Sequence, residues 1–105
     1  MFASVYVTAS SMAEAEALAR KALDARLAAC ANAWPLQSWY WWQGKVEHAE
    51  EAALLLKTRR ELVPQLTALL EREHSYDVPC VVAWPIAEGS ADYLAWVARE
   101  ASAKP

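Results

Sequence analysis

Three side chains that commonly bind metal ions lie within seven residues of one another, at His74, Asp77 and Cys80. An imidazole and a thiolate together suit Cu(I) or Zn(II), and a carboxylate extends the range towards harder metals. The spacing matches no zinc-finger pattern, so this metal-site hypothesis competes with a second interpretation. In that interpretation His74 caps a helix or faces solvent, and Cys80 is an inert thiol buried in a strand.

Catalytic chemistry has little support in this sequence. Neither histidine, His48 or His74, stands in a recognised motif with a nucleophile. The two glycines, Gly44 and Gly89, cannot build a glycine-rich phosphate-binding loop. We therefore expect a protein that is not an enzyme and that requires no cofactor. The only candidate for a bound ion is copper or another divalent cation.

Composition argues against a nucleic-acid partner and against a membrane protein. The chain has 10 Lys and Arg against 13 Asp and Glu, a net charge of −3, whereas phosphate binding needs clustered positive charge. The aromatic octet of RNA-recognition domains is absent. No apolar run approaches the ~18 residues of a transmembrane helix, and the N-terminus lacks the basic region of a signal peptide. These features predict a cytoplasmic location.

The aromatic content is high for a chain of 105 residues, with six Trp and four Tyr. Four of them are consecutive, at Trp39, Tyr40, Trp41 and Trp42. Successive side chains of a strand point to opposite faces, so this segment would carry large aromatic rings on both faces. Such a strand needs a covering partner, and we predict that these four residues form an interface between copies of the chain.

Local patterns predict a single α+β domain that spans residues 1–105. The first half should contain a strand at Phe2–Ala9, a helix from a Ser11–Glu14 capping box to Leu27, and strands at Cys30–Trp34 and Leu36–Trp42. A Gln43–Gly44 turn then leads into strand segments at Lys45–His48 and Ala52–Lys57. The remainder should contain a capping box at Thr58 and Glu61, a helix from about Arg60 to Ser75, a strand at Cys80–Trp84, and a helix from Ser90 or Asp92. Pro35 should mark a bend or an edge position, and Trp84 and Trp96 should lie in the core. This order predicts a ferredoxin-like βαββαβ sandwich, an antiparallel four-stranded sheet under two helices, with an additional C-terminal helix.

The central segment resembles the CutA divalent-cation tolerance family. Residues Ser38–Val46 (S-W-Y-W-W-Q-G-K-V) are similar to its S-x-Y-W-W-x-G-K-V/I hairpin, and His74–Pro79 (H-S-Y-D-V-P) to its H-P-Y-E-V-P loop. Further matches are Val7–Ala9, Arg26–Asn32 (R-L-A-A-C-A-N), Leu56–Thr58 (L-K-T) and Asp92–Trp96 (D-Y-L-A-W). The resemblance is collinear over nearly the whole chain.

This resemblance implies a homotrimer with sheets packed around a threefold axis, and a role in tolerance of divalent metal ions such as copper. The motif residues Lys45, Lys57 and Tyr76 would line a cleft between subunits; in the alternative, Lys45 is only an exposed residue of the hairpin tip. The overall shape also resembles the trimeric PII-type signalling proteins. A trimer that binds a small ligand or signals, with no metal role, is therefore the alternative.

The copper ligands proposed in some family members carry over only in part. A Cys of the first strand corresponds to Val7 here, and a His pair at the end of the second helix reads Glu73–His74. Only His74 is retained. A metal site built from His74, Asp77 and Cys80 would therefore be a feature of this chain rather than of the family.

Overall fold

The computed structural model describes residues 1–105, which form four strands and three α-helices. The elements are β1 (Phe2–Ala9), α1 (Met12–Asp24), β2 (Cys30–Trp42), β3 (Lys45–Arg59), a 3-10 helix (Arg60–Leu62), α2 (Val63–Glu73), β4 (Val81–Ile86) and α3 (Ala91–Glu100). Their order confirms the predicted βαββαβ pattern with an additional C-terminal helix. None of the helices combines the length and apolar character that a membrane crossing requires.

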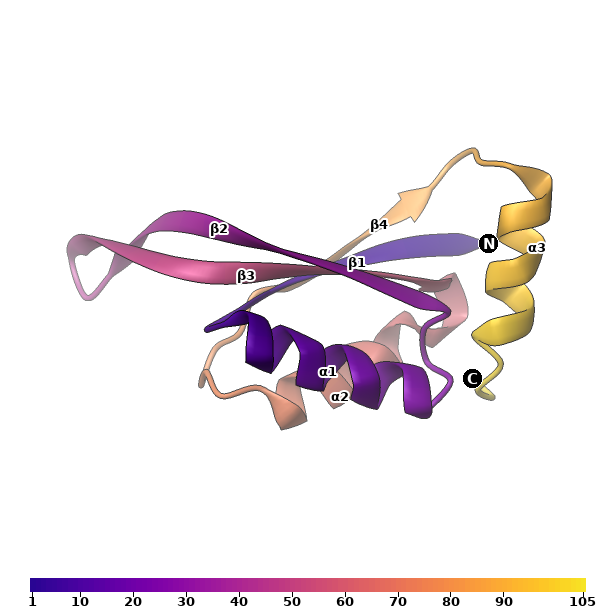
Figure 1. The fold of residues 1–105 in the computed structure, drawn as a ribbon, viewed down its shortest axis with the longest axis horizontal. Helices are drawn as coiled ribbons and strands as arrows, with labels where there is room; N and C mark the ends of the chain where they lie inside the picture. The colour runs from indigo at the N-terminus through magenta and orange to yellow at the C-terminus, as the bar shows by residue number, and fades with distance from the viewer.

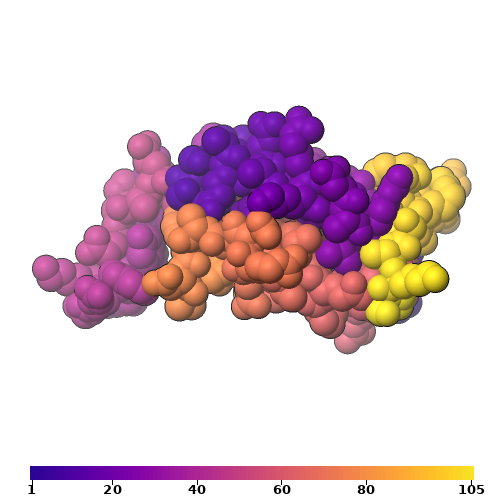
Figure 2. Space-filling view, turned by 90° about the horizontal axis from the view of Figure 1, so that it is seen from below, coloured from indigo at the N-terminus to yellow at the C-terminus, as the bar shows by residue number.

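All four strands pair antiparallel, in the order β2-β3-β1-β4. Helices α1 and α2 lie side by side against one face of the sheet, while α3 stands at the end of the sheet where β1 begins (Figure 1). Strands β2 and β3 continue past the helices as a two-stranded hairpin, and the molecule measures 44 × 25 × 21 Å. Seen from the helical side, the hairpin projects at one end and the C-terminal residues lie at the other (Figure 2).

The core lies between the two helices and one face of the sheet. In β1, Val5 and Val7 are fully buried, and the alternate residues Tyr6 and Thr8 are only half-buried. The other large side chains that are fully buried are Leu18 of α1, Leu54 and Leu56 of β3, Leu62 of the 3-10 helix, Leu66 and Leu70 of α2, and Val97 of α3. Burial of one Leu or Val side chain contributes about 1.5–3 kcal/mol, so this layer is the main source of stability.

Side-chain caps begin two of the three helices. The Ser11 hydroxyl accepts a hydrogen bond from the Glu14 backbone N–H at 3.1 Å, which confirms the predicted start of α1. The Ser90 hydroxyl caps α3 in the same way. The predicted capping box at Thr58 and Glu61 is wrong, because the Thr58 hydroxyl is buried and donates to the Leu27 carbonyl at 2.7 Å.

Two further details differ from expectation. The edge position predicted for Pro35 is confirmed, but β2 runs through Pro35 without the predicted break, since an edge strand needs no N–H donor on its outer side. Trp84 is 45% exposed rather than part of the core. It lies opposite Ser4 on edge strand β4, on the sheet face that the helices leave open. Trp96 is half-buried and packs near Tyr93, with 5.6 Å between ring centroids.

Candidate functional site

The far end of the β2–β3 hairpin carries the four aromatic residues that were predicted as an interface. Trp39, Trp41 and Trp42 expose 67%, 75% and 54% of their surface, and Tyr40 exposes 43%. Trp39 stacks on the ring of His48, with 4.7 Å between ring centroids. Exposed aromatic surface concentrated in one place is typical of a binding surface.

The sheet face that the helices leave open is also apolar. It exposes Trp34, Val82 and Trp84, and the rings of Tyr6 and Trp84 lie 6.3 Å apart. Trp34 and Trp84 were not predicted as surface residues. Strand alternation was the missed signal, because Trp84 faces Ser4 and therefore lies on the side opposite the buried valines of β1.

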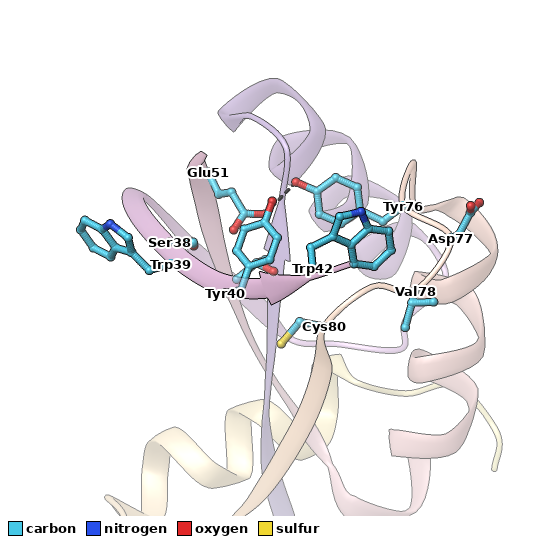
Figure 3. A pocket seen from close by; sticks show the side chains of 10 residues that line it. Ser38, Trp39, Tyr40, Trp42, Glu51, Tyr76, Asp77, Val78 and Cys80 are labelled. Carbon is cyan, nitrogen blue, oxygen red and sulfur yellow. Dashed lines mark hydrogen bonds between the residues drawn. The ribbon is translucent and has the colours of Figure 1, made fainter. Parts of the chain in front are cut away.

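A pocket of about 460 Å³ opens where the hairpin meets the loop between α2 and β4. The residues that matter most in its lining are Tyr40 and Trp42 from β2, Glu51 from β3, and Tyr76, Asp77 and Cys80 from the loop that leads into β4. The rings of Tyr40, Trp42 and Tyr76 gather beside Glu51, whereas Trp39 points away from them (Figure 3). The lining contains no Lys or Arg.

A hydrogen bond joins two walls of this pocket. The Tyr76 hydroxyl donates to Glu51 Oε2 at 2.7 Å. Burial raises the pKa of the Tyr76 phenol well above its usual range, and the hydrogen bond to Glu51 and its negative charge raise it further. Burial also raises the pKa of Tyr6, with added effects from the charges of Cys80 and Glu51. The two phenols therefore stay protonated beside a carboxylate.

His74 holds the loop that carries Tyr76. Its side chain is fully buried, and Nε2 donates to the Thr8 carbonyl at 2.7 Å. Nδ1 accepts from the Tyr76 backbone N–H at 3.1 Å. Both ring nitrogens are therefore occupied, so His74 positions the loop and presents no free nitrogen to a metal ion.

Glu14 connects the start of α1 to the same loop. Its carboxylate accepts hydrogen bonds from the Ser10 N–H at 2.9 Å, the Ser10 hydroxyl at 2.8 Å and the Ser75 N–H at 2.8 Å. Burial alone would raise the pKa of Glu14, but these hydrogen bonds outweigh it and lower the pKa to about 2. In the folded chain, the Glu14 carboxyl is consequently ionised at neutral pH.

The predicted ligands His74, Asp77 and Cys80 do not form a metal site within one chain. No group of three or more His, Cys, Asp or Glu side chains is placed to hold an ion. Asp77 and Cys80 line the pocket, whereas the ring of His74 is turned to the Thr8 carbonyl. Cys80 is also exposed, so its interpretation as a buried, inert thiol is wrong.

The predicted cleft residues Lys45, Lys57 and Tyr76 lie apart within one chain. Lys45 follows the hairpin turn, and Lys57 pairs with Cys30 at the other end of the ladder. The Lys57 ammonium donates to Asn32 Oδ1 at 3.0 Å. Only Tyr76 lines the pocket. A cleft between subunits that brings the three together stays a prediction.

Comparison with known proteins gives a consistent match. A family model described as CutA1 divalent ion tolerance protein matches residues 3–100. The divalent-cation tolerance protein CutA of Archaeoglobus fulgidus is 42% identical over 93 residues, which cover 89% of this chain and 91% of that protein. Protein CutA 1, chloroplastic, of Oryza sativa subsp. japonica is 43% identical over 94 residues, 89% of this chain and 53% of that protein. The solved structure of the periplasmic divalent cation tolerance protein CutA from Archaeoglobus fulgidus superposes with a TM-score of 0.95 at 39% identity, over 97% of this chain and 100% of that one.

These relatives correct the predicted location. One similar structure is that of a periplasmic protein, and the rice relative is chloroplastic. The expectation of a purely cytoplasmic protein is therefore wrong, because similar proteins are found in other compartments. The predicted family resemblance, in contrast, is confirmed along almost the whole sequence: the chain belongs to the CutA1 divalent ion tolerance family.

Proposed function

We propose that this chain forms a homotrimer that contributes to divalent-cation tolerance by binding a divalent metal ion, with copper as the first candidate, and that it catalyses no reaction. The similar proteins are named for divalent-cation tolerance. The family model that matches is likewise described by divalent ion tolerance, a description that names no reaction. Binding rather than turnover is also what the pocket chemistry favours, since it contains no nucleophile activated by a neighbouring base.

The observation that carries this proposal is the apolar surface that one chain leaves uncovered. Trp34, Val82 and Trp84 are exposed on the open sheet face, and Trp41 and Trp42 are exposed on the hairpin. Each Å² of apolar surface removed from water contributes about 25 cal/mol, so covering these faces favours assembly. Three copies around an axis would cover both the open face and the hairpin, which is the arrangement that the motifs imply.

The metal-binding part of the proposal depends on Cys80. This thiol is the more exposed of the two cysteines and lies in the pocket lining together with Asp77. Thiolates are preferred ligands of Zn(II) and also of Cu(I), the reduced form of copper. Because one chain supplies no group of three ligands, we expect donors from a neighbouring copy to complete the coordination.

The test is mass measurement under native conditions, after chelator treatment and then with added copper or zinc. We expect a trimer that takes up metal in a fixed ratio. Cys80→Ser should abolish the uptake, whereas Cys30→Ser, whose thiol lies 3.1 Å from the Tyr93 hydroxyl, should retain it. A trimer that takes up no metal would contradict the metal role, and a monomer would contradict the assembly.

The alternative of a PII-like signalling trimer gains no particular support. The family model that matches is that of CutA1. The pocket lining has no basic residue and no glycine to hold a phosphate group. We therefore propose only the metal-tolerance function.

A further inference from the structure

The pocket beside Glu51 is larger and more aromatic than a metal ion requires. Its volume of about 460 Å³ falls in the range of small-molecule sites, about 300–1,000 Å³. Its rings come from two separate parts of the chain, with Tyr40 and Trp42 on β2 and Tyr76 on the loop after α2. Figure 3 shows these rings next to the Glu51 carboxylate. The site therefore combines several π faces with one negative charge.

The charge of the lining selects the sign of the ligand. Two acidic residues, Glu51 and Asp77, line the pocket without any Lys or Arg to balance them. An anion would be repelled, and a neutral ligand would bury Glu51 without compensating its charge. A cation would satisfy the carboxylate, and an organic cation would also gain from the aromatic faces, which attract ammonium groups.

Several contacts hold the site in place before any ligand binds. Tyr76 donates its hydroxyl to Glu51 at 2.7 Å, and His74 accepts the Tyr76 backbone N–H at 3.1 Å. Glu14 accepts the preceding N–H of the loop, that of Ser75, at 2.8 Å. A site whose walls are already fixed loses less conformational entropy when a ligand binds.

We propose that this pocket binds a small organic cation, with its ammonium or quaternary ammonium group among the rings of Tyr40, Trp42 and Tyr76 and its charge compensated by Glu51. This site is distinct from the proposed metal site in its chemistry, because it uses π faces and a carboxylate and does not need the Cys80 thiol. A cationic side chain of a neighbouring copy is the competing occupant.

The first experiment compares two ligands of one shape on the unmodified, chelator-treated protein by calorimetric titration. Choline carries a quaternary ammonium group, and 3,3-dimethylbutan-1-ol is its neutral isostere. We expect choline to bind at least about tenfold more tightly, because only the cation gains the aromatic and carboxylate contacts. Equal affinities would overturn the proposal. Binding of neither ligand would overturn it too, and would indicate that the pocket is closed or filled by another copy.

Two variants then locate the effect. Glu51→Gln keeps an acceptor for the Tyr76 hydroxyl and removes the charge, so choline should bind about tenfold more weakly while the isostere is unaffected. Glu50→Gln makes the same change in net charge on the opposite face of β3 and should leave choline binding unchanged. Equal losses of choline affinity in both variants would mean that the net charge of the protein, and not the Glu51 carboxylate, attracts choline. That result would overturn the assignment to this pocket. Circular dichroism and thermal unfolding check that both variants fold, and the comparison of ligands on the unmodified protein needs neither variant.

The organic-cation proposal and the metal proposal can be tested independently of each other. Cys80→Ser should lose metal uptake and keep choline binding. Glu51→Gln, in contrast, should weaken choline binding about tenfold and keep metal uptake. A Cys80→Ser protein that also loses the preference for choline over its isostere would contradict a separate organic-cation site.

Discussion

The two halves of the β2–β3 hairpin share one backbone ladder but lie in opposite environments. The register runs without a bulge from the Cys30–Lys57 pair to the Trp42–Lys45 pair. Near the base Leu54 is fully buried, whereas Val46, on the same face and eight residues earlier in β3, is 56% exposed. Burial therefore depends on how far α1 and α2 extend along the sheet, and not on the strand pattern.

This contrast indicates two different sources of order. The base is held by the core of its own chain, while a two-stranded hairpin alone is marginally stable in water. In the proposed trimer, neighbouring copies would cover the aromatic residues of the far half and supply its order. Variants at the base should therefore affect unfolding of the chain, and variants at the tip should affect assembly.

The largest effect is expected from a truncation at the base. Leu54→Ala removes a fully buried side chain and should lower the free energy of unfolding by about 2–5 kcal/mol. Val46→Ala, on the same face near the tip, should lower it by less than about 1 kcal/mol. Denaturant titrations of both variants measure the difference. Equal losses would mean that the tip is as tightly packed as the base.

Truncation of an aromatic residue at the tip should act on assembly instead. Trp41 is 75% exposed in the single chain, and Trp41→Ala should weaken association by about 2–4 kcal/mol, as for other large interface residues. Sedimentation over a dilution series measures this change. Met12→Ala removes an exposed side chain on α1 and should leave the dissociation constant unchanged. A Trp41→Ala protein that dissociates no more readily than the unmodified one would rule out the interface role.

Acid should lower the free energy of unfolding by protonating Glu14, whose carboxylate joins the start of α1 to the loop after α2. The pKa of this carboxyl is about 2 in the folded chain, below its ordinary value of 4.5, so its contribution is complete above pH 4.5 and disappears as the pH falls towards 2. Glu14→Gln should cost about 1.5–3 kcal/mol of stability at pH 7, and the difference should shrink between pH 4.5 and 2. Denaturant titrations at several pH values measure it. A difference that does not change with pH would show that shape rather than charge is responsible.

The smallest effect is expected at the turn itself. Gly44 has φ of +79°, where an L side chain is strained, and Gly44→Ala should cost about 1 kcal/mol. Nothing lies within 4 Å of the added methyl group, so the cost comes from the backbone alone. Gln43 also has positive φ, at +50°, and Gln43→Gly should be neutral or slightly stabilising. Hydrogen exchange of the hairpin amides measures both, and a loss in Gln43→Gly would contradict this account.

Much of this fold could be predicted from the sequence, because it depends on local patterns. The alternation in β1, the Ser11 cap and the Gln43–Gly44 turn each leave a signal within a few residues. The candidate site was harder to predict, since its members come from distant segments. Nothing near His74 in sequence reveals that its ring is taken up by the Thr8 carbonyl, 66 residues away.

The surface role of Trp84 was missed for a related reason. Its strand looks like a buried strand by composition, and only the sheet order places it on an edge and on the open face. The same knowledge of sheet order would have identified Trp34. Pairing between strands, rather than the composition of each strand, therefore decides which aromatic residues face outward.

The unbroken ladder also limits how this hairpin can change during evolution. Its pairing closes on a two-residue turn, so adding one residue to each strand extends the tip and leaves every side chain below it on its original face. Adding a single residue to one strand would exchange the faces of all the residues between the insertion and the turn. Hairpins of different length that keep this pattern should thus differ by an even number of residues. The hairpin can change its reach in steps of two without any change in the covered half.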